Sequence, residues 1–215
     1  MEDDVPSPIS NYGRSKLAGE QAAAEYSSSV PITIVRPPIV FGPGDRAVLE
    51  VMRPIARWGL HCVPDSVQGE DCCYSLVYVD DLVEGLLLVA ERGERLVEHA
   101  PSSSPGRGMY FIAGEESPTY AQLGQMIAKA LGRAPPLVAP VPRPMMMLAG
   151  LMGDVKALVL GRSGWVNSDK VAESLAGSWT CSSAKAHKHM GWSPAADLSV
   201  RLGETVRWYR QAGWL

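Results

Sequence analysis

The sequence has few cysteines and no excess of basic residues. Its four cysteines form no Cys-x-x-Cys pair, and His187 and His189, two residues apart, do not have the spacing of a helical metal pair. We therefore expect no metal site. The net charge of −3 over 215 residues argues against non-specific binding of nucleic acid, which requires a clustered basic surface.

Long apolar runs and a secretory signal are also missing. The longest apolar stretch, residues 145–160, is interrupted by Asp154 and Lys156 and is shorter than the roughly 20 residues that cross a bilayer. We expect no transmembrane segment there, and a buried helix or a lid rather than a helix on a membrane surface. Residues 1–4 are acidic where a signal peptide is basic and then apolar, so we expect a cytoplasmic protein with reduced thiols.

The remaining composition is that of a globular protein, with 46% hydrophobic and 20% charged residues. Strands are predicted at residues 31–36, 74–79 and 109–113, and Asp80 is predicted to cap the helix that follows the second of them. Helices are predicted near residues 12–28, 47–58, 80–90, 117–131, 145–160, 169–175, 182–190 and 198–210. This alternation of strands and helices indicates an α/β protein.

Tyr12 and Lys16 form the most informative pair in the sequence. Four residues apart on a helix, they share one face and can point at one reacting centre. An ammonium group beside a phenol stabilises the phenolate, which lowers a tyrosine pKa from about 10 towards a range that suits proton transfer. A Tyr-x-x-x-Lys spacing also arises by chance, as a surface lysine near a half-buried tyrosine, so its context has to decide.

Residues 42–47 imitate a phosphate-binding loop. GPGDRA fits the pattern G-x-G-x-x-G/A, follows a predicted strand and opens a predicted helix. Such a loop binds pyrophosphate through backbone N–H groups, whereas Pro43 has none and Asp45 adds a repelling carboxylate. We therefore predict a tight strand-to-helix turn, and no other glycine pattern in the sequence forms a phosphate cradle.

Three segments, in order and at typical spacing, resemble the extended short-chain dehydrogenase/reductase superfamily. This is the NAD-dependent epimerase/dehydratase group, which also includes 3β-hydroxysteroid dehydrogenases and dihydroflavonol-reductase-like enzymes. The segments are residues 12–20 (YGRSKLAGE), 34–45 (IVRPPIVFGPGD) and 77–82 (VYVDDL). The tail, with Lys185, Gly191, Trp192, Pro194, Trp208 and Tyr209, looks like that of the same group, so the resemblance spans essentially the whole chain.

The resemblance implies an enzyme that uses NAD or NADP. Tyr12 resembles the family's proton donor and acceptor, and Lys16 resembles the lysine that binds the nicotinamide ribose. Pro37, Pro38 and Ile39 fall where the family's backbone lines the nicotinamide pocket, for which prolines provide rigid apolar walls. For Asp80 and Asp81, a structural role at a helix start is favoured over an acid/base pair.

The family's glycine-rich first half lies upstream of the tyrosine, where this sequence has eleven residues. The resemblance therefore implies an α/β fold comprising the second half of a Rossmann-like doubly wound sheet with a C-terminal, mainly helical substrate-binding lobe. We expect residues 1–92 to form the truncated catalytic portion and residues 93–215 the lobe, interleaved with it. The strand at residues 32–35 would lack neighbours, so a homo-oligomer or another partner is expected to cover its edge.

Three functions stay open. The chain is an oxidoreductase or epimerase half-site, a non-catalytic binding or assembly remnant, or a truncated gene product. The substrate is a small alcohol or ketone of sterol-like, flavonoid-like or sugar-like chemistry. Nucleotide-sugar enzymes need positive groups for the diphosphate, for which Arg46, Arg53, Arg57 and Arg143 are candidates, whereas the methionine-rich stretch at residues 145–147 favours an apolar substrate.

Overall fold

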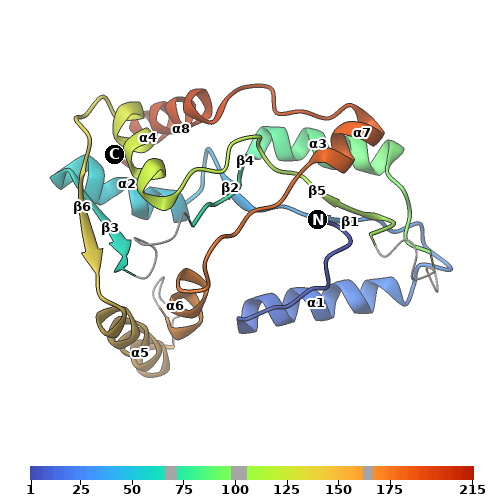
Figure 1. Cartoon of the computed structure of the whole chain (residues 1–215), viewed down its shortest axis with the longest axis horizontal. Coiled ribbons are helices and arrows are strands. Elements are labelled where there is room, and N and C mark those ends of the chain that lie inside the picture. The colour runs from blue at the N-terminus through green and yellow to red at the C-terminus, as the bar shows by residue number, and fades with distance from the viewer. Residues whose placement is uncertain (66–71, 98–105, 162–166) are drawn as a thin grey trace.

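The computed structural model describes residues 1–65, 72–97, 106–161 and 167–215. Strands and helices alternate along the first two thirds of the chain, and helices follow one another after β6 (Figure 1). The α/β class predicted from the sequence is thereby confirmed. In chain order the elements are α1 (Asn11–Ala24), β1 (Ile34–Arg36), β2 (Ile39–Phe41), α2 (Ala47–Trp58), β3 (Leu60–Pro64), β4 (Leu76–Tyr78), α3 (Val79–Arg92), β5 (Met109–Phe111), α4 (Tyr120–Ala130), β6 (Leu137–Val141), α5 (Arg143–Leu160), α6 (Ser168–Ser174), α7 (Ala184–Met190) and α8 (Leu198–Gln211).

The strands pair in parallel as β1 with β5, β2 with β4, and β3 with β6. At least one helix separates the two strands of each pair along the chain, as parallel pairing requires. This is the Rossmann-like pattern that the sequence predicted for the second half of a doubly wound sheet. Within the described residues, the strands form three two-stranded sheets rather than one continuous ladder.

Two adjacent prolines direct the chain from one sheet to the next. β1 ends at Arg36 and β2 begins at Ile39, so Pro37 and Pro38 lie between them. Proline has no N–H to donate to a ladder, and a strand does not continue through such a pair. The chain therefore exchanges β5 as a partner for β4, and β2 is a strand that the sequence analysis did not predict.

β3 and β6 were missed as well. They pair over five residues, from Leu60 opposite Leu137 to Pro64 opposite Val141. The sequence around β6 is rich in proline and shows no alternation of apolar and polar residues, which is why it suggested a loop. β6 is extended because it pairs with β3, which is distant in the sequence, and not because its own residues favour a strand.

Two hydrophobic clusters hold the elements together. The larger one joins α2, α4 and α8 to β2 and β4 around Met52, Ile55, Ile127, Leu202 and Tyr209, all fully buried. The smaller one, with Val89, Tyr110, Ile112 and Trp192 among its members, joins α3 and α7 to β5. The C-terminal helix α8 thus packs on elements from the first part of the chain.

The start of α3 differs from the prediction. Tyr78, not Asp80, occupies the N-cap position, and it makes no side-chain capping bond. The prediction of an Asp80 cap is wrong because β4 runs directly into the helix, which leaves Asp80 in the first turn, where negative charge is also favourable. Asp81 is 3% exposed and forms an ion pair with Arg201 of α8, which places it in a structural role.

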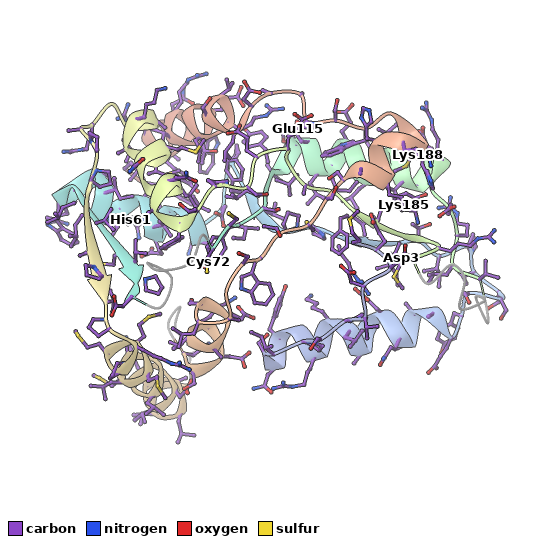
Figure 2. The ribbon with its side chains drawn as sticks, in the orientation of Figure 1. Asp3, His61, Cys72, Glu115, Lys185 and Lys188 are labelled. Carbon is purple, nitrogen blue, oxygen red and sulfur yellow. The ribbon has the colours of Figure 1, made fainter. Side chains whose placement is uncertain are left out.

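His61 of β3 lies against the start of α4 (Figure 2). Its side chain is buried, and its Nε2 is 2.9 Å from the carbonyl oxygen of Tyr120, to which it donates a hydrogen bond. A Cβ atom added to Gly124 would lie 2.3 Å from the imidazole ring, so only glycine fits at that point of α4. Burial lowers the pKa of His61, although the bond to Tyr120 opposes this shift.

α5 lies at one end of the molecule, beside α6 (Figure 1). The helix was predicted as a buried helix or a lid, and burial is wrong, since most of its large apolar side chains are exposed. α6 packs on the other side of the helix, at Gly150. No helix that the structure describes combines the length and apolar composition needed to cross a membrane.

Candidate active site around Tyr12 and Lys16

Tyr12 and Lys16 lie on the first two turns of α1, the helix that the sequence predicted. Ser10 provides the N-cap, and its Oγ accepts a hydrogen bond from the N–H of Gly13 at 2.9 Å. The helix ends at Ala24, before the serine run at which it was predicted to stop. The Lys16 ammonium lies 5.2 Å from the centroid of the Tyr12 ring, so the two side chains are neighbours on one face.

α1 is held by polar contacts rather than by apolar packing. None of its residues is buried, and Tyr12 is 58% exposed. Near its C-terminal end, Arg36 of β1 donates two parallel hydrogen bonds to the Glu20 carboxylate, at 2.9 and 2.6 Å. This half-buried ion pair connects the helix of the Tyr-x-x-x-Lys motif to the strand that precedes Pro37.

Asp169 fixes the opposite end of α1. Its two carboxylate oxygens accept hydrogen bonds from the backbone N–H groups of Asn11, at 2.9 Å, and Tyr12, at 3.1 Å. These two bonds to a helix N-terminus hold the pKa of Asp169 below its usual range. Figure 1 shows α6 beside this end of α1. The residue that aligns the tyrosine's backbone therefore comes from the C-terminal part of the chain.

Lys170 brings a second cation to the tyrosine. Its ammonium lies 5.5 Å from the centroid of the Tyr12 ring and also forms an ion pair with Glu173 at 2.7 Å. Sequence reasoning missed Asp169 and Lys170 as parts of this site. A helix was predicted at their position, but only the folded chain shows that its start meets the start of α1.

The three residues expected to line the nicotinamide pocket follow Arg36, the partner of Glu20, directly in the chain. Pro37 is exposed, Pro38 is half-buried and Ile39 is 37% exposed. Ile39 opens β2 opposite Leu76 of β4. The ion pair joins this segment to α1, but two helical turns separate Glu20 from Tyr12, a rise of about 12 Å along the axis.

The loop at residues 42–47 is a strand-to-helix turn, as predicted. The carboxylate of Asp45 accepts hydrogen bonds from the N–H groups of Ala47 and Val48, both at 2.9 Å. Those are the donors that a phosphate would need at the start of α2. Tyr209 of α8 donates a hydrogen bond to the Asp45 carbonyl at 2.6 Å, which ties the turn to the core.

A hollow of about 250 Å³ opens elsewhere, beside the Asp81–Arg201 pair. Its lining includes Tyr78, Glu115 and Pro194 but neither Tyr12 nor Lys16. The carboxylate of Asp81 is occupied by Arg201 Nε, at 3.0 Å, and by the N–H of Ala195, at 3.2 Å. These contacts stabilise the packing of α8 and leave Asp81 no free oxygen for acid/base chemistry.

The described residues contain no group of three or more histidine, cysteine or acidic side chains that could hold a metal ion. The candidate site therefore consists of a phenol, two ammonium groups and a helix N-terminus. Such a set can donate or accept one proton at an exposed position and can hydrogen-bond hydroxyl groups.

The profile of the RmlD substrate binding domain matches residues 1–146, which include Tyr12, Lys16 and the segment around Pro37. The chain belongs to this family. It thereby falls within the extended short-chain dehydrogenase/reductase superfamily that its three motifs predicted.

Two curated proteins are similar to this member of the family along nearly its whole length. A ceramide reductase of Caulobacter vibrioides is 28% identical over 209 residues, which cover 96% of this chain and 59% of the reductase. A decarboxylating sterol-4-alpha-carboxylate 3-dehydrogenase of Saccharomyces cerevisiae is 22% identical over 204 residues, which cover 94% and 57%. The chain thus spans less than two thirds of the length of either relative.

A solved structure shares the fold. The UDP-glucuronic acid 4-epimerase of Bacillus cereus, in complex with UDP-glucuronic acid and NAD, aligns with a TM-score of 0.67 at 19% identity. The alignment covers 99% of this chain and 56% of the epimerase. At this identity the likeness confirms the Rossmann-like arrangement, and the activity of this chain is a separate question.

Proposed function

We propose that this chain provides the catalytic helix and the substrate-binding lobe of an NAD(P)-dependent oxidoreductase or epimerase. The substrate carries a carbinol or ketone. The observation that carries the proposal is the exposed Tyr12 phenol with the Lys16 ammonium beside it, on a helix whose N-terminus the C-terminal part of the chain fixes. Similarity to reductases, dehydrogenases and epimerases supports it.

The residues fit the nicotinamide end of a dinucleotide but not its phosphates. Tyr12 and Lys16 offer exposed donors for a ribose hydroxyl, and Pro37, Pro38 and Ile39 offer an apolar wall without competing N–H groups at the prolines. The one glycine-rich turn that imitates a phosphate cradle already uses its N–H groups on Asp45. Strong binding of a dinucleotide therefore needs a phosphate cradle that residues 42–47 do not provide. When bound, the nicotinamide supplies the hydride transfer at the substrate carbon.

Tyr12 moves the proton that accompanies this transfer. In the direction of reduction, its hydroxyl donates a proton to the substrate oxygen, and in the direction of oxidation its phenolate accepts the proton of the carbinol. Lys16 stabilises the phenolate by its charge and orients the ribose by hydrogen bonding. The polar contacts at both ends of α1 hold Tyr12 in one orientation, which proton transfer requires.

We propose an apolar alcohol or ketone, of the sterol or other lipid kind, as the substrate rather than a nucleotide sugar. Three of the four arginines considered for a diphosphate have other partners. Arg53 pairs with Glu50, Arg46 lies over the Trp214 ring, and Arg57 lies over the Trp58 ring. The two curated relatives named above act, by their names, on a ceramide and a sterol carboxylate.

A second candidate is a non-catalytic binding or assembly protein. The start of α2 is its support, because the N–H groups there are bound to Asp45 and are not open to a phosphate. In either case, we propose that a partner or a second copy covers the free edge of β1, whose pairing in the described residues is with β5 alone.

An assay in which a glycine-rich half is joined to this chain tests the proposal. Nicotinamide absorbance is followed with sterol-like alcohols and ketones and with nucleotide sugars. Turnover of sterol-like compounds supports the proposal, and turnover of nucleotide sugars alone shows that the substrate class is wrong. Substrate binding without any turnover favours the non-catalytic alternative.

A further inference from the structure

α5 has more exposed large apolar side chains than any other helix that the structure describes. The helix has 18 residues and is about 27 Å long. Its large apolar side chains are mostly more than half exposed, for example Leu158 at 86% and Met152 at 64%. The exposed members are Met145, Met147, Leu148, Leu151, Met152, Val155, Leu158 and Val159.

From Gly150 onward the inner face of α5 carries small residues, which fixes the orientation of the helix. Gly150 is buried, and a Cβ atom there would lie 3.1 Å from the Ser168 Cα and from the Val171 Cγ2 of α6. Gly153 and Ala157 follow on the same side and are half-buried. The close packing on α6 therefore uses the glycine side, and the large side chains face outward.

At the angular spacing of an α-helix, the exposed apolar residues span an arc of roughly 160°. A helix of a globular protein normally turns such a face towards a core. Single exposed apolar residues are common on protein surfaces, but a contiguous apolar face of this width indicates a binding surface. Within the described residues, α6 covers the opposite side only.

The acidic groups of α5 and α6 have partners within the chain. Asp154, which is exposed near one border of the face, accepts from the Ser168 N–H at 3.3 and 3.4 Å, and Asp169 binds the start of α1. The third acid of the α5–α6 pair, Glu173, is bound to Lys170. Arg143 and Lys156, by contrast, are exposed and form no ion pair within the described parts of the chain. By helical geometry, they flank the two borders of the apolar face.

We propose that α5 lies on the surface of an anionic lipid bilayer. Its apolar face would enter the boundary between head groups and acyl chains, with Arg143 and Lys156 at the level of the anionic head groups. A second copy of α5 fits less well, because it brings the same two cations and, among the described residues of the helix, offers them Asp154 alone, which already accepts from the Ser168 N–H. The inference does not depend on the proposed dehydrogenase activity.

The test is sedimentation of the whole chain with vesicles of phosphatidylcholine alone and of phosphatidylcholine with phosphatidylglycerol. We expect stronger association with the anionic vesicles. Leu151→Glu and Val155→Glu, in the middle of the face, should each weaken it on the order of tenfold or more, because each replaces a buried apolar contact with a charge. Arg143→Gln and Lys156→Gln should each weaken it roughly fivefold.

Leu87→Glu on α3 is the matched control, since Leu87 is 61% exposed and Val155 is 60% exposed. It should bind as the unmodified chain does. If Leu151→Glu fails to fold, by circular dichroism, Leu158→Glu replaces it, because that side chain is almost fully exposed. Absence of vesicle binding by the unmodified chain, equal binding to neutral and anionic vesicles, or unchanged binding of the face variants would overturn the proposal. A dimer in lipid-free solution that Leu151→Glu dissociates would assign the face to a second copy instead.

Discussion

The carboxylate of Asp169 accepts a hydrogen bond from the backbone N–H of Tyr12, although 157 residues separate the two in the chain. The C-terminal part of the chain, the proposed substrate lobe, thus contacts the helix that carries the proposed proton shuttle. Because the contact joins a carboxylate to a helix N-terminus, its strength depends on the charge of Asp169.

Asp169→Ala should loosen the first turn of α1. The substitution removes both acceptors of the Asn11 and Tyr12 N–H groups, so hydrogen–deuterium exchange at these amides should accelerate, while exchange in α4 stays unchanged. Asp154→Asn, which alters a comparable backbone contact at Ser168, is the control. Unchanged exchange at Asn11 and Tyr12 would show that Asp169 does not hold the helix.

The same contact should depend on pH. The pKa of Asp169 is lowered in the folded chain by the two backbone N–H bonds, so its contribution is present above the unfolded value of 3.8 and is lost as the pH falls through the folded value. Protection of the Tyr12 amide, after correction for intrinsic exchange, should therefore persist at pH 5 and be lost only at pH values below 3.8. In the Asp169→Ala variant, protection of the Tyr12 amide should not change over this pH range.

His61 should make the stability of the fold sensitive to mild acid. Burial lowers its pKa below 6.5, so the unfolded chain takes up a proton before the folded chain does, and the free energy of unfolding decreases as the pH falls from 6.5 through the folded value. His61→Phe keeps a ring but loses the bond to Tyr120. It should be less stable at neutral pH, yet its urea midpoint should vary less between pH 7.5 and 5.5. An equal pH dependence in both proteins would exclude His61 as the cause.

The Asp81–Arg201 pair should contribute far more to the free energy of unfolding than the exposed ion pairs do. Its side chains are 3% and 14% exposed, so Arg201→Met leaves a buried carboxylate with one N–H bond and should cost about 3–5 kcal/mol in denaturant unfolding. Arg53→Met breaks a pair that is 50% and 45% exposed and should cost at most about 1 kcal/mol. Similar losses in the two variants would contradict the structural role assigned to Asp81.

The chain by itself should bind NAD(H) or NADP(H) weakly or not at all. Backbone N–H groups at a helix N-terminus supply much of dinucleotide affinity, and those of α2 are occupied by Asp45. Isothermal titration calorimetry of the 215-residue chain measures this directly. A dissociation constant in the low micromolar range would reveal a cofactor site that neither the sequence nor the geometry indicates.

The sequence predicted those parts of the fold that depend on neighbouring residues, such as helix ends and turns. The bounds of α2 are those predicted, because the turn after Phe41 and the glycine after Trp58 mark its ends. That the side chains of Tyr12 and Lys16 lie next to each other also follows from their four-residue spacing on a helix. β2, β3 and β6 were missed because short strands next to prolines carry no alternation, and their pairing is a long-range choice.

Other features required tertiary structure. Nothing in the residues near Asp169 shows that it meets Tyr12, since that contact depends on how α6 returns to α1. The methionine-rich helix was predicted to be buried or a lid, and burial is wrong, because an apolar composition does not reveal which face the neighbouring helix covers. The small residues at positions 150, 153 and 157 were the available signal for that face.

The turnover of Tyr12→Phe tests the central claim most directly. In an assembly that contains the glycine-rich half, the substitution removes only the exposed hydroxyl, so folding should persist while the rate falls roughly 10²–10⁴-fold. Lys16→Met should lower the rate as well, since it removes the ammonium beside the Tyr12 ring. Near-normal turnover of Tyr12→Phe, on a substrate that the unmodified enzyme uses, would show that Tyr12 is not the proton shuttle.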